Sequence, residues 1–424
     1  MSPQFDVILF GATSFVGTII SRYLASQYGN GHDLRWAIAG RNPHRLRQLR
    51  IELEDRYGHE LADLPILEAD ASRYDQLLGL CATTRVMISA VGPYALYGEP
   101  LVRACADAGT DYVDLTGEPH WIRQMQERYH ARAQQTGARL IHSCGFDSIP
   151  SDMGVWFLQH EASSRFGYSC DQIEMRLSAA RGGFSGGTVA SLLNVLVDMK
   201  KDPDIAAEMA DPYSACPDGH GFRITQPDAN LVRKHRPSGR WSMPFIMGAI
   251  NSRVVHRTNA LRNGRYGRHF RYDEAVLTRS GPIAGLATHA LTTVGKVFFK
   301  LLCWQPARML LQRFVLPKPG EGPTEQQQES GFFDMHFYGY HNGEPAIRVR
   351  VAADKDPGYG ATARMIGEAA VCLAKDFHAA DGSKTPSPSG WLTPASVFDL
   401  RLIERLRHQA GMTFEEIGGP TLLR

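Results

Sequence analysis

A glycine turn between an apolar run and a helical pattern is the stretch best suited to chemistry. Residues 5–10 (FDVILF) are short and apolar, which is typical of a buried parallel strand. The turn that follows consists of Gly11, Ala12, Thr13, Ser14, Phe15, Val16 and Gly17. Apolar residues then recur at helical spacing from Val16 to Leu24. Because glycine lets the backbone approach phosphate oxygens and a helix N-terminus offers free N–H groups, the pattern predicts a pyrophosphate site.

The spacing of the turn is G-x-x-S-x-x-G, with Ser14 where a dinucleotide-binding turn usually has its middle glycine. An ordinary strand-to-helix turn is the alternative. The residues at the end of the next predicted strand, 34–39, distinguish an NAD site from an NADP site. NAD sites place an Asp or Glu there for the ribose 2′-hydroxyl, whereas this chain has Arg41, which suits a 2′-phosphate. We therefore predict that NADP(H) is bound by Gly11, Thr13, Ser14, Phe15, Val16, Gly17 and Arg41, assisted by Arg45 one helical turn further on.

The elements that must position this turn continue the same rhythm. Predicted strands and helices alternate six times between residues 5 and 143, which is typical of a doubly wound parallel sheet. We therefore expect an α/β protein whose residues 1–152 form a Rossmann domain. Ligands of such sheets lie beyond the carboxyl ends of the strands. The further cofactor contacts predicted at those ends are Asp70, which flanks the adenine, and Val91, Gly92 and Pro93.

Two tyrosines and one aspartate at strand ends are the predicted catalytic residues. Tyr94 and Tyr97 follow the fourth strand, and their hydroxyls suit proton donation or a hydrogen bond to an oxyanion. The alternative is that both rings pack over the cofactor. Asp147 follows the sixth strand, either as an acid or as the cap of a turn. Further candidates at the strand ends are Glu118, His142 and Ser148.

The composition is that of an ordinary globular protein. The 424 residues carry a net charge of +2, so nothing in the overall charge calls for a nucleic-acid partner. Seven cysteines are scattered without a Cys/His cluster, which argues against a metal site and for a reducing compartment. The N-terminus lacks the pattern of a signal peptide. We therefore expect a cytoplasmic protein.

Beyond residue 152 the rhythm changes. We expect a second domain over 153–355, for substrate and dimer contacts, and a C-terminal helical segment over 356–424. A second glycine turn at 182–188 opens a predicted helix at 189–200. Two strands between 332 and 353 are expected to pair through Asn342-Gly343 as a hairpin.

Two stretches of the second half differ in character from the rest. Residues 223–272 hold eleven Lys or Arg and one acid, which indicates a solvated basic face or a docking patch for an acidic partner or an anionic membrane. Residues 282–316 are largely apolar, but Lys296 and Lys300 argue against a membrane span. We expect a core helix or the wall of a lipophilic pocket. Interfacial contact is the third alternative, so any membrane contact is peripheral.

Several runs along the chain are distinctive enough to indicate a family. They are GATSFVG at 11–17, AGR at 39–41, VGPYALYGEPLVRACADAGTDYVDLTGEP at 91–119, HSCGFDSIPSD at 142–152 and DPGYGATARMIGE at 356–368. Through them the chain resembles the saccharopine dehydrogenase-like oxidoreductases, and most of all the trans-acting enoyl reductases. The resemblance implies an N-terminal Rossmann domain, a second α/β domain and a C-terminal segment that returns to the first.

The resemblance also implies an activity and partners. Such enzymes reduce a carbon–carbon double bond in an acyl chain made by a polyketide synthase that lacks its own enoyl reductase. The substrate would be an acyl or polyketide chain on a carrier protein or synthase, with NADPH as hydride donor and a homodimer as the assembly to test. Two alternatives stay open. One is an imine reductase similar to saccharopine reductase, and the other is a non-catalytic NADP-binding protein of lipid surfaces.

Overall fold

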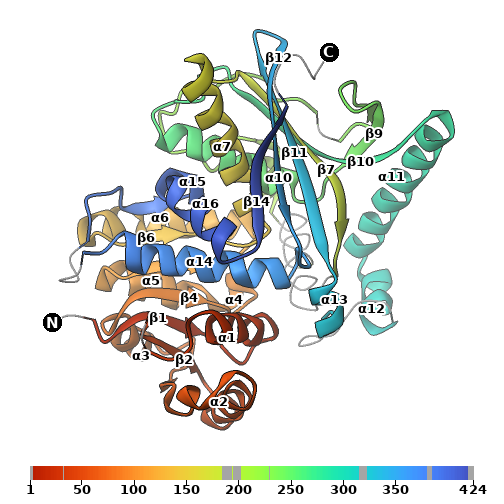
Figure 1. The fold of residues 1–424 in the computed structure, drawn as a ribbon. Helices are drawn as coiled ribbons and strands as arrows, with labels where there is room; N and C mark the ends of the chain where they lie inside the picture. Colours follow the sequence, from red (N-terminus) through yellow and green to blue (C-terminus); the bar gives the residue numbers. More distant parts are fainter. Residues whose placement is uncertain are drawn as a thin grey trace. The chain divides into compact units, whose positions relative to one another are not determined.

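The computed structural model describes residues 3–31, 33–183, 193, 202–228, 230–314, 322–379 and 384–418. The chain groups into two compact units (Figure 1). The first holds residues 1–146, 320–322 and 358–411, and the second holds 147–319, 323–357 and 412–424. The sequence suggested boundaries at 152 and 355, whereas the units divide at 146 and 357, and the chain enters the second unit again at 412.

A parallel sheet of seven strands forms the core of the first unit. Its order is β13-β6-β5-β4-β1-β2-β3, and all neighbouring strands are parallel. The strands are β1 (Phe5–Phe10), β2 (Trp36–Gly40), β3 (Ile66–Glu68), β4 (Thr84–Ser89), β5 (Asp111–Asp114), β6 (Arg139–Ile141) and β13 (Gly390–Leu392). The winding reverses between β1 and β4, which is where doubly wound sheets bind ligands. The predicted Rossmann sheet is confirmed, and it gains a seventh strand from the C-terminal part of the chain.

Two groups of helices pack on this sheet. One group is α1 (Phe15–Tyr28), α14 (Gly360–Asp376) and α16 (Asp399–His408), and the other is α3 (Tyr74–Cys81), α5 (Glu99–Ala108) and α6 (Pro119–Thr136). The unit also contains α2 (Pro43–Tyr57), α4 (Tyr94–Tyr97), α15 (Pro394–Val397) and a 3₁₀ turn, η1 (His59–Asp63). α14 lies against β1, β4 and β5, and 13 of its 17 residues are buried. Its small residues permit this approach, because a side chain at Gly367 would lie 2.8 Å from Tyr23.

The second unit is built on a mixed sheet with the order β14-β12-β11-β7-β10-β9-β8. The strands are β7 (Gln172–Arg181), β8 (Arg233–Lys234), β9 (Arg240–Pro244), β10 (Arg271–Ser280), β11 (Phe332–His341), β12 (Glu344–Ala353) and β14 (Met412–Gly418). β7 and β10 run parallel, and the other neighbouring pairs are antiparallel. Asn342 and Gly343, with φ of 53° and 82°, form the tight turn between β11 and β12, so the predicted hairpin is confirmed.

The two faces of the second sheet differ in polarity. Ile173, Met175 and Leu177 of β7 are buried, and the residues between them, Glu174 and Arg176, point to the opposite face. The apolar face packs against α7 (Ile149–Phe166) and α10 (Gly248–Leu261). The remaining helices of the unit are α9 (Pro203–Ala210), α11 (Pro282–Cys303), α12 (Gln305–Phe314) and α13 (Glu325–Glu329).

The apolar stretch at 282–316 forms α11 and α12, apart from its last two residues, which lie outside the described part of the chain. A core helix was one expectation, and it is wrong. Most large apolar side chains of α11 are exposed, because the helix turns glycine and threonine residues toward the sheet. Within the described residues α11 alone is long and apolar enough to cross a membrane, judged by length and composition only. The predicted helix at 189–200 and the turn from 184 to 188 lie outside the described residues, Leu193 excepted.

Candidate cofactor and catalytic site

The glycine turn lies at the carboxyl end of β1 and leads into α1. Gly11 has a φ of 85°, and a side chain there would lie 2.5 Å from the Val91 side chain. A side chain at Gly17 would lie 2.2 Å from the carbonyl oxygen of Gly11. Both positions therefore require glycine. The turn can approach a ligand closely, which is what a pyrophosphate needs.

Ser14 is the N-cap of α1. Its hydroxyl accepts a hydrogen bond from the backbone N–H of Gly17 at 3.0 Å. The departure from the usual glycine spacing is thereby explained, since serine is a preferred residue at a helix N-cap. Thr13, Phe15 and Val16 are partly exposed at the same turn. The N-terminus of α1 thus faces the carboxyl edge of the sheet without an acidic residue in its first turn.

The loop after β4 lies next to this turn. The backbone N–H of Ala90 donates to the carbonyl of Phe10 at 2.9 Å, and Val91 contacts Gly11. Gly92 and Pro93 follow, joined by a cis peptide bond. The structure thus brings together the cofactor residues predicted after β1 and β4, at the position where the winding reverses.

Arg41 and Asp70 stand at the ends of β2 and β3. Hydrogen bonds from the backbone and the hydroxyl of Ser72, at 2.8 and 2.7 Å, lower the pKa of Asp70, and the charges of Arg41 and Arg73 lower it further. Arg41 itself is exposed. The neighbouring strand ends therefore present guanidinium groups, which suit a phosphate better than a ribose hydroxyl.

Tyr94 is buried rather than open to a ligand. Its hydroxyl donates to the carbonyl of Ser89 at 3.0 Å and accepts from the backbone N–H of Leu115 at 3.2 Å. The ring packs against Trp121 at a centroid distance of 5.7 Å. These contacts tie the end of β4 to the end of β5. They favour a structural role for Tyr94 that differs from both expectations, which were a catalytic hydroxyl and a ring packed over the cofactor.

Glu118 explains how the short helix α4 is held. Its carboxylate accepts hydrogen bonds from the backbone N–H groups of Tyr94 and Ala95 at 3.0 and 2.9 Å. A carboxylate at a helix N-terminus stabilises that end. The other end of α4 carries Leu96 and Tyr97, which are 64% and 50% exposed. Tyr97 is therefore the most exposed of the three predicted catalytic residues.

His142 and Asp114 form a buried pair at the ends of β6 and β5. Nδ1 of His142 lies 2.6 Å from a carboxylate oxygen of Asp114, which also accepts from the Tyr112 hydroxyl at 2.9 Å. Burial and the Asp114 charge raise the pKa of Tyr112 well above its usual value. The imidazole stacks on Trp391 of β13 at 4.0 Å. The sequence could not reveal this stack, because its two residues are far apart along the chain.

Asp147 belongs to the second unit and lies half-buried in the turn before α7. The residue after it, Ser148, is buried and donates its hydroxyl to the side chain of Asn251 at 3.0 Å. Asn251 in turn donates to Ser151 and Glu274, at 3.0 and 2.9 Å. Two serines of the HSCGFDSIPSD run, Ser148 and Ser151, therefore make contacts with α10 and β10.

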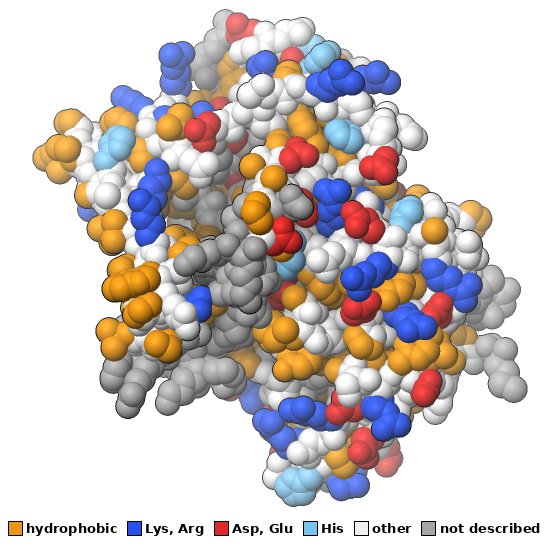
Figure 2. All heavy atoms as spheres, turned by 180° about the vertical axis from the view of Figure 1, so that it is seen from behind, with side chains coloured by type: hydrophobic (Ala, Val, Ile, Leu, Met, Phe, Trp, Pro, Cys, Tyr) orange, Lys and Arg blue, Asp and Glu red, His pale blue; other side chains and the backbone are white. Residues whose placement is uncertain are grey.

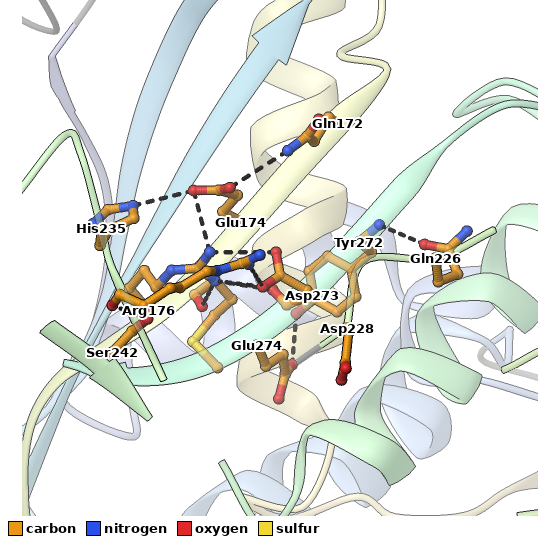
Figure 3. Close-up of polar contacts among 12 residues, drawn as sticks. Gln172, Glu174, Arg176, Gln226, Asp228, His235, Ser242, Tyr272, Asp273 and Glu274 are labelled. Atoms are coloured by element: carbon orange, nitrogen blue, oxygen red, sulfur yellow. Dashed lines mark hydrogen bonds and ion pairs between the residues drawn. The ribbon is translucent and has the colours of Figure 1, made fainter. Parts of the chain in front are cut away.

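A charged network crosses the polar face of the second sheet (Figure 3). Arg176 of β7 lies 3.1 Å from Asp273 and 3.2 Å from Glu174, and Glu174 lies 3.1 Å from His235. Burial raises the pKa of Glu174, but His235 and the arginine charges outweigh it and lower that pKa to about 2. Burial raises the pKa of Asp273 above its ordinary value. The network was not expected from the sequence, although the alternation of Glu174 and Arg176 with apolar residues is a signal of it.

Within the described part of the chain, no group of three or more Cys, His, Asp or Glu residues is placed to hold a metal ion. Cys144, which lies in the loop after β6, is buried. The geometry of the glycine turn supports the binding of a dinucleotide at the carboxyl ends of β1 and β4.

Comparison with known proteins defines the class first. Residues 7–141 match the saccharopine dehydrogenase NADP binding domain. The first sheet, with its glycine turn, is thus the NADP-binding domain of a saccharopine dehydrogenase-like oxidoreductase. Among solved structures, apo saccharopine dehydrogenase from Saccharomyces cerevisiae is similar, with a TM-score of 0.49 and 10% identity over 98% of this chain and 100% of that one.

The relatives that match the full length narrow the class to one family. A Mycobacterium tuberculosis protein named trans-acting enoyl reductase is 36% identical over 425 residues, covering 96% of this chain and 97% of that one. A Mycobacterium ulcerans protein of the same name is 34% identical over 421 residues, covering 95% and 96%. Another M. tuberculosis protein, named provisionally for this activity, is 40% identical over 412 residues and 95% of each chain. The chain belongs to the trans-acting enoyl reductases, and these relatives favour neither alternative activity.

Proposed function

We propose that this protein uses NADPH to reduce a carbon–carbon double bond in a lipid or polyketide acyl chain. The observation that carries the proposal is its similarity, over almost the whole of both chains, to proteins named trans-acting enoyl reductase. The NADP-binding domain and the exposed Arg41 beside the glycine turn agree with it. NADPH, when bound, supplies the hydride for the β-carbon of the enoyl group.

The residues of the chain have three tasks in this reaction. Gly11 and Gly17 let the backbone approach the pyrophosphate, and Arg41 pairs with the 2′-phosphate. Tyr97 hydrogen-bonds the enolate-like oxygen or delivers a proton to the α-carbon. Asp147, half-buried before α7, is the second candidate acid. Tyr94 holds the loop that carries Tyr97 through its contacts to Ser89 and Leu115.

The partners follow from the same assignment. The acyl chain arrives on a carrier protein or a synthase, because a trans-acting reductase works on a substrate that another protein holds. The basic stretch at 223–272 offers charge for an acidic carrier. We propose that the protein acts in the cytoplasm, with no more than peripheral contact to a membrane, and as a homodimer.

The test is a fluorescence titration with NADPH and NADH, on wild type, Arg41→Ala and Arg47→Ala. Arg47 is an exposed arginine of α2 and serves as the matched control. We expect Arg41→Ala to weaken NADPH binding roughly 10- to 100-fold, since a charge-assisted hydrogen bond is lost. NADH binding and the Arg47→Ala variant should be unaffected. If Arg41→Ala weakens the binding of NADPH and NADH equally, Arg41 does not contact the 2′-phosphate.

The reaction itself is tested with an α,β-unsaturated acyl pantetheine thioester. Oxidation of NADPH and a gain of two hydrogens by the thioester, seen by mass spectrometry, are the expected results. Tight NADPH binding without turnover of any unsaturated thioester, free or carrier-bound, would contradict the proposal and favour the non-catalytic alternative.

A further inference from the structure

The side of α11 that faces the protein is made of small and polar residues. Its buried residues are Gly285, Thr288, Thr292 and Leu302. A side chain at Gly285 would lie 2.7 Å from Trp241 of β9, and the hydroxyl of Thr288 lies 2.7 Å from that of Thr278 in β10. Trp241 also donates its indole N–H to the carbonyl of Gly281 at 2.9 Å. The polar side of the helix is therefore the side that anchors it to the sheet.

The opposite side of the helix is a continuous apolar stripe. The stripe is formed by Ile283 (81%), Leu286 (75%), Val294 (65%), Val297 (51%) and Leu301 (39%), and by Trp304 (60%) at the C-cap of the helix; Leu291 is also exposed (55%). The stripe continues into α12 with Met309 and Leu310, both more than half exposed. A helix of 22 residues is about 33 Å long, so the stripe exceeds what isolated surface residues explain. A surface of this kind marks an interaction site.

The charge beside the stripe has one sign. The sequence contains no Asp or Glu between Ala275 and Gly320. Lys296 and Lys300 are exposed one helical turn apart, between the buried side of α11 and the stripe. Figure 2 shows the stripe as orange side chains with blue ones among them, along the element at the left, which is α11 and α12. The face is therefore apolar and cationic together.

This combination favours a lipid surface over a protein partner. A second copy packed through the same face would bring lysines together without an acid on either helix. Lysine is also depleted from the cores of protein interfaces. A helix that lies in a membrane interface needs an apolar side, lysines beside it whose stems reach the headgroups, and an aromatic residue such as Trp304 at the boundary.

We propose that α11 and the start of α12 lie on the surface of an anionic lipid bilayer. The apolar stripe enters the boundary of the acyl chains, and Lys296 and Lys300 contact anionic headgroups. This goes beyond the proposed reduction and does not depend on it. It would place an enzyme at the surface where lipophilic acyl chains accumulate.

The experiment is vesicle flotation of the full chain with phosphatidylcholine alone and with a mixture containing phosphatidylglycerol. We expect wild type to float with the mixed vesicles. Replacing three exposed residues together (L286S, V294S and V297S) should weaken this binding roughly tenfold or more. Replacing Lys296→Gln and Lys300→Gln together should weaken it about 25-fold on mixed vesicles, at about fivefold per lysine, and little on phosphatidylcholine.

Control variants show whether the loss of flotation is specific to the stripe. Ile51→Ser and Leu231→Ser remove apolar side chains that are 54% and 57% exposed elsewhere, and should leave flotation unchanged. Trp304→Phe should abolish a blue shift of tryptophan emission that vesicles produce in wild type. NADPH affinity, measured without vesicles, reports that each variant is folded and tests the proposed function separately.

Two results would overturn the proposal. Wild type that does not float with mixed vesicles at low salt, whatever its oligomeric state, would show that this face does not bind lipid. A dimer by light scattering that the triple serine variant dissociates, again without flotation, would assign the stripe to a second copy of the chain.

Discussion

At the scale of single residues, two tyrosines of the same short helix have different surroundings. The hydroxyl of Tyr94 is buried between Ser89 and Leu115, whereas Tyr97 is half exposed three residues later. The sequence does not distinguish the two tyrosines, because both follow β4 and both have a hydroxyl that can donate a proton. Their surroundings divide the roles: one residue holds the loop, and the other is open to a ligand.

Removal of the two hydroxyls tests this division. Tyr94→Phe leaves the N–H of Leu115 without its acceptor and should lower the free energy of unfolding by about 1–2 kcal/mol, with kcat retained. Tyr97→Phe should leave stability within about 0.5 kcal/mol and lower kcat roughly 100-fold or more. Denaturant melts and steady-state rates with an unsaturated thioester measure both effects. An unchanged kcat in Tyr97→Phe, with weaker substrate binding in Tyr97→Ala, would reduce Tyr97 to a packing residue.

The tyrosines also show where prediction from sequence ends. The glycine turn, the alternation of strands and helices and Arg41 are encoded in local stretches of the chain, so the sequence reveals them. The partners of Tyr94 come from the ends of two neighbouring strands, and the pairing of β13 with β6 joins residues far apart along the chain. Local patterns carry no information on such contacts.

At the scale of secondary-structure elements, α11 shows a related limit. Its periodicity is visible in the sequence, which favours a core helix or the wall of a lipophilic pocket over contact with a membrane interface, because apolar stripes usually pack inward. The structure packs the glycine and threonine side against β9 and β10 instead. Periodicity shows that a helix has two sides, but the contacts of the neighbouring strands decide which side is buried.

The packing of β10 on α10 gives a prediction about pH. Burial between them raises the pKa of Glu274 to about 7, although its contacts to Ser151, Tyr272 and Asn251 lower it, and the nearby charge of Asp273 raises it further. The folded state therefore holds this proton more tightly than the unfolded chain, whose value is 4.5. Stability from this group is complete below about pH 4.5 and falls as the pH rises to about 7, by about 3 kcal/mol in total.

Glu274→Gln removes the titrating group while keeping its size. Urea melts between pH 4.5 and 8 should show a gap in unfolding free energy between wild type and the variant that changes by about 3 kcal/mol over this window. Glu344→Gln, at an exposed site in β12, should follow the wild-type curve. If the gap for Glu274→Gln does not change with pH, the carboxyl is ionised in the folded protein throughout.

At the scale of the whole molecule, each sheet is completed by chain from both ends. The first unit takes residues 1–146 and then 358–411, while β14 returns to the second unit. The two long segments of the first unit meet closely, since the N–H of Phe146 donates to the hydroxyl of Thr362 at 2.9 Å. Phe15 of the glycine turn packs edge-on against Tyr359 at 5.1 Å. The NADP-binding turn therefore depends on the C-terminal part of the chain.

This dependence predicts which part of the chain folds by itself. Residues 1–146 alone lack β13 and leave uncovered the surface of β1, β4 and β5 that α14 occupies. We expect them to show no cooperative thermal transition and no NADPH binding. Joining 146 to 358 by a short Gly/Ser linker, and ending at 411, should restore a single transition and NADPH affinity within about tenfold of the whole protein. Arg41→Ala in the joined chain controls for specific binding. Cooperative melting and tight NADPH binding by 1–146 alone would show that α14 and β13 are additions to a complete domain rather than parts of its core.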